Sequence, residues 1–224
     1  MEVPRLPTGI ASVDRLLGGG VETDSVTEIY GEGGSGKTIF CLEVAHRVAR
    51  AGRWVIYVDT EGVSVDRLAK VAGADLEKVL KHTLLSTPKD REQQSEAIRT
   101  GTALARDGRR SVGLIVVDSL TYYYRLSLSG DDEAEGRQAL ALDIAALVAT
   151  SLRAGVPALV TNQVWRNVRD GTLEPLGGSF LNHAAKTILR FDRLEGPRRR
   201  VVLVKHRSIP DGSAEFRITD TGTA

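Results

Sequence analysis

The sequence predicts one α/β domain: a mainly parallel central sheet with helices on both faces and an antiparallel extension at its C-terminal end. Short apolar, β-branched runs alternate with amphipathic helical patterns over most of the chain, as is typical of parallel strands buried on both faces. After residue 185 the pattern changes to short strand-like segments joined by turns. The 224 residues suffice for one well-buried domain, and two would be cramped.

The first part of the chain contains the runs expected to form the parallel strands, at 26–30, 54–58, 112–117 and 156–161. Helices are expected at 37–51, 65–72, 90–106 and 136–154. In the first of these, Phe40, Val44 and Val48 fall on one face, and Gly52 stands where a helix should end. Strands and helices that alternate in this way favour parallel pairing through right-handed crossovers.

The C-terminal part is expected to add strands at 187–194, 200–206 and 215–219. Turns are expected at Glu195-Gly196-Pro197 and Pro210-Asp211-Gly212, and connections this short can join only antiparallel neighbours. No internal repeat, low-complexity tract or interdomain linker interrupts the pattern. We therefore expect residues 1–224 to form a single domain.

Composition excludes several classes of protein. The net charge of +1 and the pI of about 7.9 give no overall attraction to nucleic acid, so DNA binding would need a local basic cluster. The single Cys41 excludes an internal disulfide and a cysteine-based zinc site, and it fits a reducing compartment. Neither a signal peptide nor an apolar stretch long enough to span a bilayer is present, which predicts a cytoplasmic protein with no membrane partner.

Residues 31–38, GEGGSGKT, match the phosphate-binding pattern G-x-x-x-x-G-K-[ST], between an expected strand and an expected helix. Glycines let successive N–H groups point at phosphate oxygens, Lys37 reaches the β- and γ-phosphates, and the Thr38 hydroxyl ligates Mg²⁺. The helix that follows directs its positive end at the same anion. The cofactors predicted are ATP and Mg²⁺, and the predicted nucleotide-binding residues are Gly31, Glu32, Gly33, Gly34, Ser35, Gly36, Lys37 and Thr38.

Two acidic residues follow expected strands. Asp118 ends the run LIVVD, where ligands of open α/β sheets bind, so it is predicted to hold Mg²⁺ through water. Glu61 follows the strand at 54–58 and is predicted to orient and deprotonate an attacking water. The alternatives are structural: Asp118 could cap a helix, and Asp59 or Glu61 could cap the helix that follows the second strand.

The chain resembles a known family over essentially its whole length. The segments that carry the resemblance are LPTGIASVDRLLGGG (6–20), GEGGSGKT (31–38), YVDTEG (57–62), LIVVDSLT (114–121), VTNQV (160–164), LGGSFLNHAAKT (176–187) and FRITDTG (216–222). They are similar to the archaeal RadA and RadB branch of the RecA recombinase family. The resemblance implies a RecA-like P-loop NTPase core.

One departure separates the groups within that branch. The recombinases carry an N-terminal helix-hairpin-helix domain and a linker with a polymerisation motif, whereas the phosphate-binding loop here begins at Gly31. The chain therefore looks like RadB, the short paralogue of RadA. This resemblance implies a role in recombinational repair, DNA binding and weak ATPase activity without strand exchange. It also implies the RadA recombinase and the Holliday-junction resolvase as partners. A homo-oligomer is a separate expectation.

The resemblance also assigns site residues. Glu61 matches the catalytic glutamate. Gln163 matches the glutamine that senses the γ-phosphate and relays it to the DNA-binding loops; its alternative is a polar strand end without a switching role. Residues 165–174 and 177–184 match the two DNA-binding loops. Arg residues there could contact phosphates and aromatic residues could stack on unpaired bases. The alternatives are a packed Trp165 and solvated arginines. The DNA-binding candidates are Trp165, Arg166, Arg169 and Phe180.

Lys205 and Arg207, in Lys205-His206-Arg207, resemble the trans-acting finger of KaiC-like ATPases, in which cations of a neighbouring subunit reach the γ-phosphate. The alternative is a surface pair on an edge strand. Three other functions stay open from the sequence. They are a KaiC-like signalling ATPase, in which DNA plays no part, a recombinase that forms filaments and exchanges strands, and a nucleotide switch that acts only through protein contacts.

Overall fold

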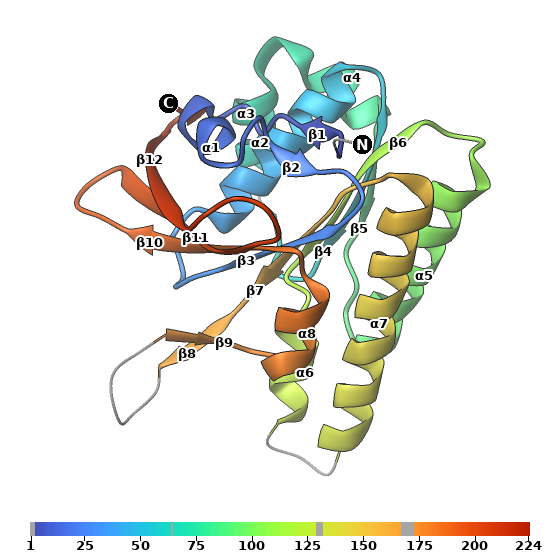
Figure 1. Cartoon of the computed structure of the whole chain (residues 1–224). Coiled ribbons are helices and arrows are strands. Elements are labelled where there is room, and N and C mark those ends of the chain that lie inside the picture. Colours follow the sequence, from blue (N-terminus) through green and yellow to red (C-terminus); the bar gives the residue numbers. More distant parts are fainter. Residues whose placement is uncertain (1–2, 64, 129–131, 167–172) are drawn as a thin grey trace.

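The computed structural model describes residues 3–63, 65–128, 132–166 and 173–224. Its central sheet runs in the order β13-β12-β11-β10-β3-β7-β6-β4-β5 (Figure 1). From β10 to β5 every neighbouring pair is parallel, and from β10 to β13 every pair is antiparallel. The parallel strands are β3 (Val26–Tyr30), β4 (Trp54–Asp59), β5 (Thr83–Ser86), β6 (Val112–Asp118), β7 (Ala158–Asn162) and β10 (Thr187–Arg193). The antiparallel extension adds β11 (Arg198–His206), β12 (Gly212–Thr219) and β13 (Gly222–Thr223).

Helices cover both faces of this sheet (Figure 1). One face carries α1 (Ala11–Leu16), α2 (Lys37–Arg50), α3 (Val65–Ala72) and α4 (Leu76–Lys81), with a 3-10 turn at Gly73–Asp75. The other carries α5 (Arg91–Asp107), α7 (Glu133–Ala154) and α8 (Gly178–Ala184), and the short α6 (Tyr122–Ser127) packs on α7. Two small antiparallel pairs complete the fold: β1 (Arg5–Leu6) with β2 (Val21–Glu22), and β8 (Val164–Arg166) with β9 (Leu173–Pro175).

Each face of the sheet has its own apolar core. On the α2 side, the Phe40 ring meets the edge of Phe191 at 5.4 Å between centroids, and Phe191 meets Phe216 at 5.9 Å. This edge-to-face chain ties α2 to β10 and β12 and therefore anchors the antiparallel extension to the parallel sheet. On the other side, Ile98 of α5 and Ile144 of α7 are fully buried among strand residues.

The predicted fold class is confirmed, with helices and strands close to their predicted ranges. Two details differ. The first C-terminal strand, β10, pairs in parallel with β3 before β11 turns back, so the antiparallel part begins one strand later than expected. The edge strand β5 was not predicted. Among the described helices, none has the length and apolarity needed to cross a membrane.

Candidate functional site

The carboxyl ends of four adjacent parallel strands meet at one edge of the sheet. The order β3-β7-β6-β4 places the loop after β3 beside the ends of the other three strands. Those ends carry Gln163 after β7, Asp118 at the end of β6, and Glu61 after β4. Ligands of open α/β sheets bind at such an edge. The predicted nucleotide-site residues are thus brought together from distant parts of the sequence.

The phosphate-binding loop requires glycine at two positions for different reasons. At Gly36, the residue preceding α2, φ is 102°, a left-handed conformation that residues with a Cβ rarely adopt. At Gly31, φ is 154° and an added Cβ would lie 2.2 Å from the Phe191 carbonyl oxygen. Strand β10 therefore packs directly against the first residue of the loop.

The residues of the loop fit a chain of phosphates. Helix α2 begins at Lys37 without a side-chain cap, which leaves its first N–H groups available to an anion. The Lys37 ammonium donates to the carbonyl oxygens of Gly31 (2.8 Å) and Glu32 (3.1 Å). Burial lowers the pKa of Lys37, opposed by the charges of Glu61 and Asp118. The Ser35 hydroxyl is buried and has no hydrogen-bond partner among the described residues.

Asp118 is almost fully buried beside this loop. Its carboxylate accepts hydrogen bonds from the hydroxyls of Thr161, Thr38 and, at 3.1 Å, Tyr57. Burial raises the pKa of Asp118, and the hydrogen bonds from Thr161 and Thr38 act against this rise. The Thr38 contact brings together the two side chains predicted for Mg²⁺. Since no group of three or more metal-ligating side chains gathers in the described part of the chain, a cation here would take its remaining ligands from phosphate and water.

Asp59 and Glu61 have different roles at the end of β4. The Asp59 carboxylate accepts from the backbone N–H groups of Glu61 (3.1 Å), Gly62 (2.9 Å) and Val63 (2.6 Å), and so fixes the turn. The exposed Glu61 carboxylate accepts a 2.7 Å hydrogen bond from the side-chain amide of Gln163. The three N–H groups bound by Asp59 precede α3, so Asp59 holds the turn before that helix and the bonds do not show it capping the helix itself. The two residues assigned by resemblance, Glu61 and Gln163, touch each other.

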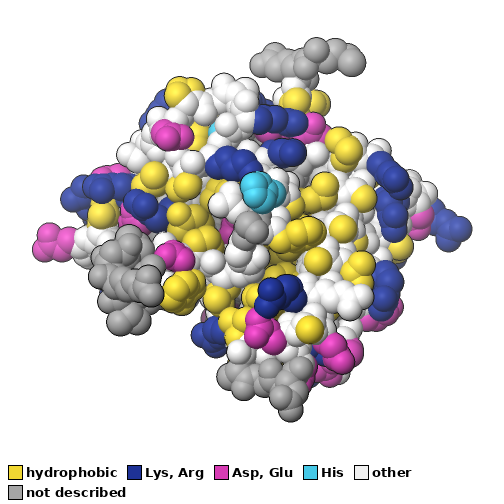
Figure 2. All heavy atoms as spheres, turned by 60° about the horizontal axis from the view of Figure 1, so that its bottom comes forward, with side chains coloured by type: hydrophobic (Ala, Val, Ile, Leu, Met, Phe, Trp, Pro, Cys, Tyr) yellow, Lys and Arg dark blue, Asp and Glu magenta, His cyan; other side chains and the backbone are white. Residues whose placement is uncertain are grey.

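The DNA-binding candidates lie at the end of the molecule formed by β8, β9 and α8. Trp165 on β8 is 47% exposed and Phe180 on α8 is 49% exposed, so neither ring is a core residue. Figure 2 looks onto this end: Lys and Arg side chains lie in several separate groups among hydrophobic ones. The backbone of Arg166 belongs to β8, whereas its side chain and the whole of Arg169 lie outside the described residues. DNA binding by these residues stays a prediction.

Lys205 and Arg207 both make contacts within the chain. The Lys205 ammonium donates to the Asn182 carbonyl oxygen of α8 (2.5 Å). The Arg207 guanidinium pairs with the buried Glu22 carboxylate (2.8 Å) and with Asp24 (2.5 Å). A role in trans, which stays a prediction, would require these contacts to break.

Sequence reasoning missed Glu28 and Asn162, two fully buried residues that hydrogen-bond each other beneath α8. The signal was a glutamate inside VTEIY, since an unpaired charged residue is rarely placed within a buried strand.

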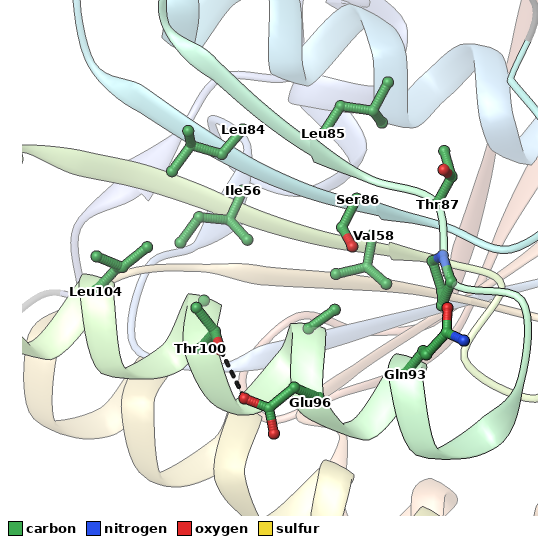
Figure 3. A pocket seen from close by; sticks show the side chains of 13 residues that line it. Ile56, Val58, Leu84, Leu85, Ser86, Thr87, Gln93, Glu96, Thr100 and Leu104 are labelled. Carbon is green, nitrogen blue, oxygen red and sulfur yellow. Dashed lines mark hydrogen bonds between the residues drawn. The ribbon is translucent and has the colours of Figure 1, made fainter.

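A separate cavity of about 530 Å³ lies between α5 and the strands β4 and β5. Its lining is mainly apolar, as Figure 3 shows for Ile56, Val58, Leu84 and Leu104. None of the residues predicted to bind nucleotide lines it.

The fold and the site together define a P-loop NTPase with a RecA-like core. The chain belongs to the Rad51 family, whose model matches residues 1–224. It is 38% identical over 212 residues to the DNA repair and recombination protein RadB of Methanococcoides burtonii, covering 94% of this chain and 93% of that protein. It is 39% identical to the RadB protein of Methanoculleus marisnigri over 223 residues (99% and 98%) and 40% identical to that of Halobacterium salinarum over 224 residues (97% and 93%). The resemblance to RadB and to the RecA recombinase family is confirmed.

Proposed function

We propose that this protein is an ATP-binding accessory factor of DNA repair and homologous recombination, which binds DNA, hydrolyses ATP slowly and does not exchange strands itself. Residues 1–224 act as one ATPase core. The observation that carries the proposal is the direct contact of Gln163 with Glu61 beside Lys37 and Asp118, in a Rad51-family chain. The names of the RadB relatives support a role in DNA repair and recombination.

Each residue of the site has a role in this proposal. The amides of residues 33–38 and the Lys37 ammonium hold the phosphates, and Thr38 with Asp118 holds Mg²⁺. Bound MgATP supplies the phosphoanhydride that is cleaved. Glu61 orients water and accepts its proton, and Gln163 holds the Glu61 carboxylate.

Two contacts support slow hydrolysis. The Gln163 amide occupies Glu61 Oε1 with a 2.7 Å hydrogen bond, so this contact must open before that oxygen can accept a proton from water. Arg207, the candidate arginine finger, is held by Glu22 and Asp24 of its own chain. Without a cation supplied to the transition state, turnover is lower by a factor on the order of 10³ or more.

The proposed partners are DNA, single-stranded or branched, and by family resemblance the RadA recombinase and the Holliday-junction resolvase. The exposed rings of Trp165 and Phe180 provide stacking surfaces for unpaired bases. Because the net charge is only +1, phosphate contacts must come from local arginines.

The test combines nucleotide binding, turnover and DNA binding. Lys37→Ala should weaken binding of a fluorescent ATP analogue by about 100-fold or more, since it removes a partly buried charge partner of the phosphates. Glu61→Gln should bind the analogue normally and lower turnover by about 10²–10⁴-fold. Wild-type protein should shift single-stranded DNA in a gel, with affinity falling steeply as salt increases.

Three outcomes would overturn the proposal. Unchanged nucleotide binding in Lys37→Ala would remove the nucleotide site. ATP binding without any salt-dependent DNA shift would favour a KaiC-like signalling ATPase. ATP-dependent filaments on single-stranded DNA in electron micrographs, with strand exchange, would identify a recombinase instead.

A further inference from the structure

The tip of hairpin β10–β11 carries arginines on both of its faces, and only one face pairs them with a carboxylate. Arg198 and Arg200 both pair with Glu215 of β12, at 2.7 and 3.2 Å. Arg199, between them, points to the other face and lies opposite Arg193 across the two strands. In the part of the chain that the structure describes, no carboxylate forms an ion pair with Arg199 or Arg193. Two like charges thus lie opposite each other, an arrangement that destabilises a sheet.

This carboxylate-free face of the hairpin lies against the phosphate-binding loop. The Arg199 Nε donates to the carbonyl oxygen of Gly34 (3.0 Å). Its Nη1 donates to the carbonyl oxygens of Gly196 (3.0 Å) and Arg198 (2.7 Å), in the hairpin itself. An added Cβ at Gly34 would lie 3.9 Å from Arg193 Nη1, and Figure 1 shows the hairpin on the same side of the molecule as the loop that joins β3 to α2. Both guanidinium groups are therefore neighbours of Gly34.

The charge of Arg199 has no counterion within its own surroundings. The residue is only 9% exposed, and its hydrogen bonds go to neutral carbonyl groups. Burial and the charge of Arg193 lower the pKa of Arg199, yet a guanidinium stays ionised in a protein. Burying a cation without an anionic partner costs free energy. An anion bound at the loop would offset this cost and the repulsion between the two arginines, and phosphate is the anion that the loop fits.

The hydrogen bond to Gly34 also acts on the shape of the loop. Because a peptide group is planar and trans, the Gly34 carbonyl held by Arg199 turns the Ser35 N–H to the opposite side. There the Ser35 N–H donates to the Glu32 carbonyl oxygen (3.2 Å), which also accepts from the Lys37 ammonium (3.1 Å). These two donors are the kind that turn to a phosphate when it binds. Arg199 therefore fixes the outer side of a peptide group whose inner side faces the ligand.

We propose that Arg199 is a positioning residue of the phosphate-binding loop, and that Arg199 and Arg193 form a cationic pair that attracts the phosphates of a nucleotide from within the same chain. Arg199 holds the loop through Gly34, and bound phosphate relieves the repulsion of the pair. The pair acts on the phosphates and not on the base or on the attacking water. This inference rests on the proposed function, because it assigns two further residues to the same nucleotide site.

The test compares ligands with different numbers of phosphates on the full-length chain. A fluorescent ADP bound to the protein is displaced by ATP, ADP, AMP or tripolyphosphate, each with Mg²⁺ and at constant ionic strength. Arg199→Gln removes the charge and the fork of N–H donors, and Arg193→Gln removes the charge opposite it. The matched control is Arg198→Gln, at the neighbouring position that pairs with a carboxylate. Urea unfolding without nucleotide measures the stability of every variant.

Arg199→Gln should weaken binding of ATP, ADP and tripolyphosphate by about tenfold or more and that of AMP by less than about threefold. Its KM for ATP should rise while kcat changes by less than about threefold, since Arg199 contacts the loop and not the attacking water. A role confined to the hairpin would lower stability and leave the ratio of ADP and AMP affinities unchanged.

Arg193→Gln should affect binding and stability in opposite directions. It should weaken binding of the same three ligands by about threefold or more, whereas its free energy of unfolding without nucleotide stays equal to that of wild type or rises, because a repulsion is removed. Arg198→Gln should leave all these affinities unchanged.

The outcomes separate the inference from the proposed function. Failure of the wild-type chain to bind ATP overturns the proposed function. With ATP bound by wild type, an affinity that is unchanged in Arg199→Gln, or that falls equally for ADP and AMP, overturns the positioning role, and unchanged affinity in Arg193→Gln overturns the pair. Should Arg199→Gln fail to fold, Arg199→Lys takes its place. It keeps the charge and loses the fork of donors, so its KM for ATP should rise by about threefold or more, and an unchanged KM would refute the positioning role.

Discussion

Asp143, on α7, is a buried carboxyl group whose protonation should be visible in the stability of the fold. It lies against α5, where the Ser95 hydroxyl donates to its Oδ2 (3.0 Å), and only 6% of the residue is exposed. Burial raises its pKa to about 6, opposed by hydrogen bonds from Ser95 and Gln94. A raised carboxyl pKa means that the folded state binds the proton more tightly than the unfolded state does.

The sign of the effect follows directly. The contribution of Asp143 to stability is full below the unfolded pKa of about 4 and is lost as the pH rises through about 6. Asp143→Asn keeps an acceptor for Ser95 and cannot ionise. Relative to wild type, its free energy of unfolding should therefore increase between pH 4.5 and pH 7, by at most about 3 kcal/mol. Urea unfolding at several pH values measures the difference; a difference independent of pH would contradict the prediction.

Some site residues are identified by neighbours in the sequence, whereas others depend on contacts between distant segments. This difference explains which site residues could be predicted. The eight residues of the phosphate-binding loop are contiguous, so their spacing alone identifies them. Asp118 and Glu61 required only the assumption that strand ends meet at one edge. The division of roles between Asp59 and Glu61 required hydrogen bonds that spacing does not contain. The contact of Arg199 with Gly34 depends on register across three strands far apart in sequence.

Helix α5 packs on β4 so closely that the helix needs a glycine at the contact. An added Cβ at Gly101 would lie 2.7 Å from Ile56 Cγ2, a stiff β-branched side chain. Figure 3 shows Ile56 on the side of β4 that faces α5. In an exposed helix, glycine to alanine would stabilise by about 1 kcal/mol, but the clash here should cost about 1–3 kcal/mol.

Gly101→Ala should therefore lower stability, whereas the control Thr100→Ala, at the exposed neighbouring position, should be neutral or stabilising. Adding Ile56→Ala to Gly101→Ala should recover part of the loss, with a coupling energy of about 1 kcal/mol in a double-mutant cycle of chemical unfolding. Additive single effects would show that the helix moves away from the sheet without cost.

At the level of elements, the length and burial of a segment decided whether it could be predicted. The buried strands β3, β4, β6 and β7 are continuous apolar runs, and each lies within two residues of its expected bounds. The edge strand β5, TLLS, has four residues that are only partly buried or exposed, and such a run has no periodicity to detect. The strands β1, β2, β8 and β9 have only two or three residues each, too few for a sequence pattern, and they are recognised only by their pairing, β1 with β2 and β8 with β9.

The order of the strands in the whole sheet could not be predicted from the sequence, because it depends on contacts between distant segments. Strand β10 inserts beside β3, about 160 residues earlier in the chain, and the choice of this neighbour depends on packing of Phe191 between Phe40 and Phe216. Periodicity describes one segment at a time, whereas the antiparallel extension is positioned by contacts with α2.

The position of Arg207 in the whole molecule leads to the final prediction. Its guanidinium, directly after β11, pairs with Glu22 at the end of β2 and with Asp24 in the turn before β3, and Glu22 is 2% exposed. Arg207→Ala would leave the buried Glu22 carboxylate with Arg5 at 3.6 Å and His206 at 3.7 Å as the remaining basic groups. Loss of one partner of a largely buried carboxylate should lower the free energy of unfolding by about 1–3 kcal/mol, because Arg207 itself is about one-third exposed.

This loss should be the same at every protein concentration, since the contact lies within one chain. Arg198→Ala, which removes one exposed ion pair with Glu215, is the matched control and should cost less than about 1 kcal/mol. Thermal unfolding at two protein concentrations measures both variants. An ATP turnover per chain that rises with concentration in wild type and is flat in Arg207→Ala would contradict the role in cis, because only a residue presented to a neighbouring copy gives such a dependence.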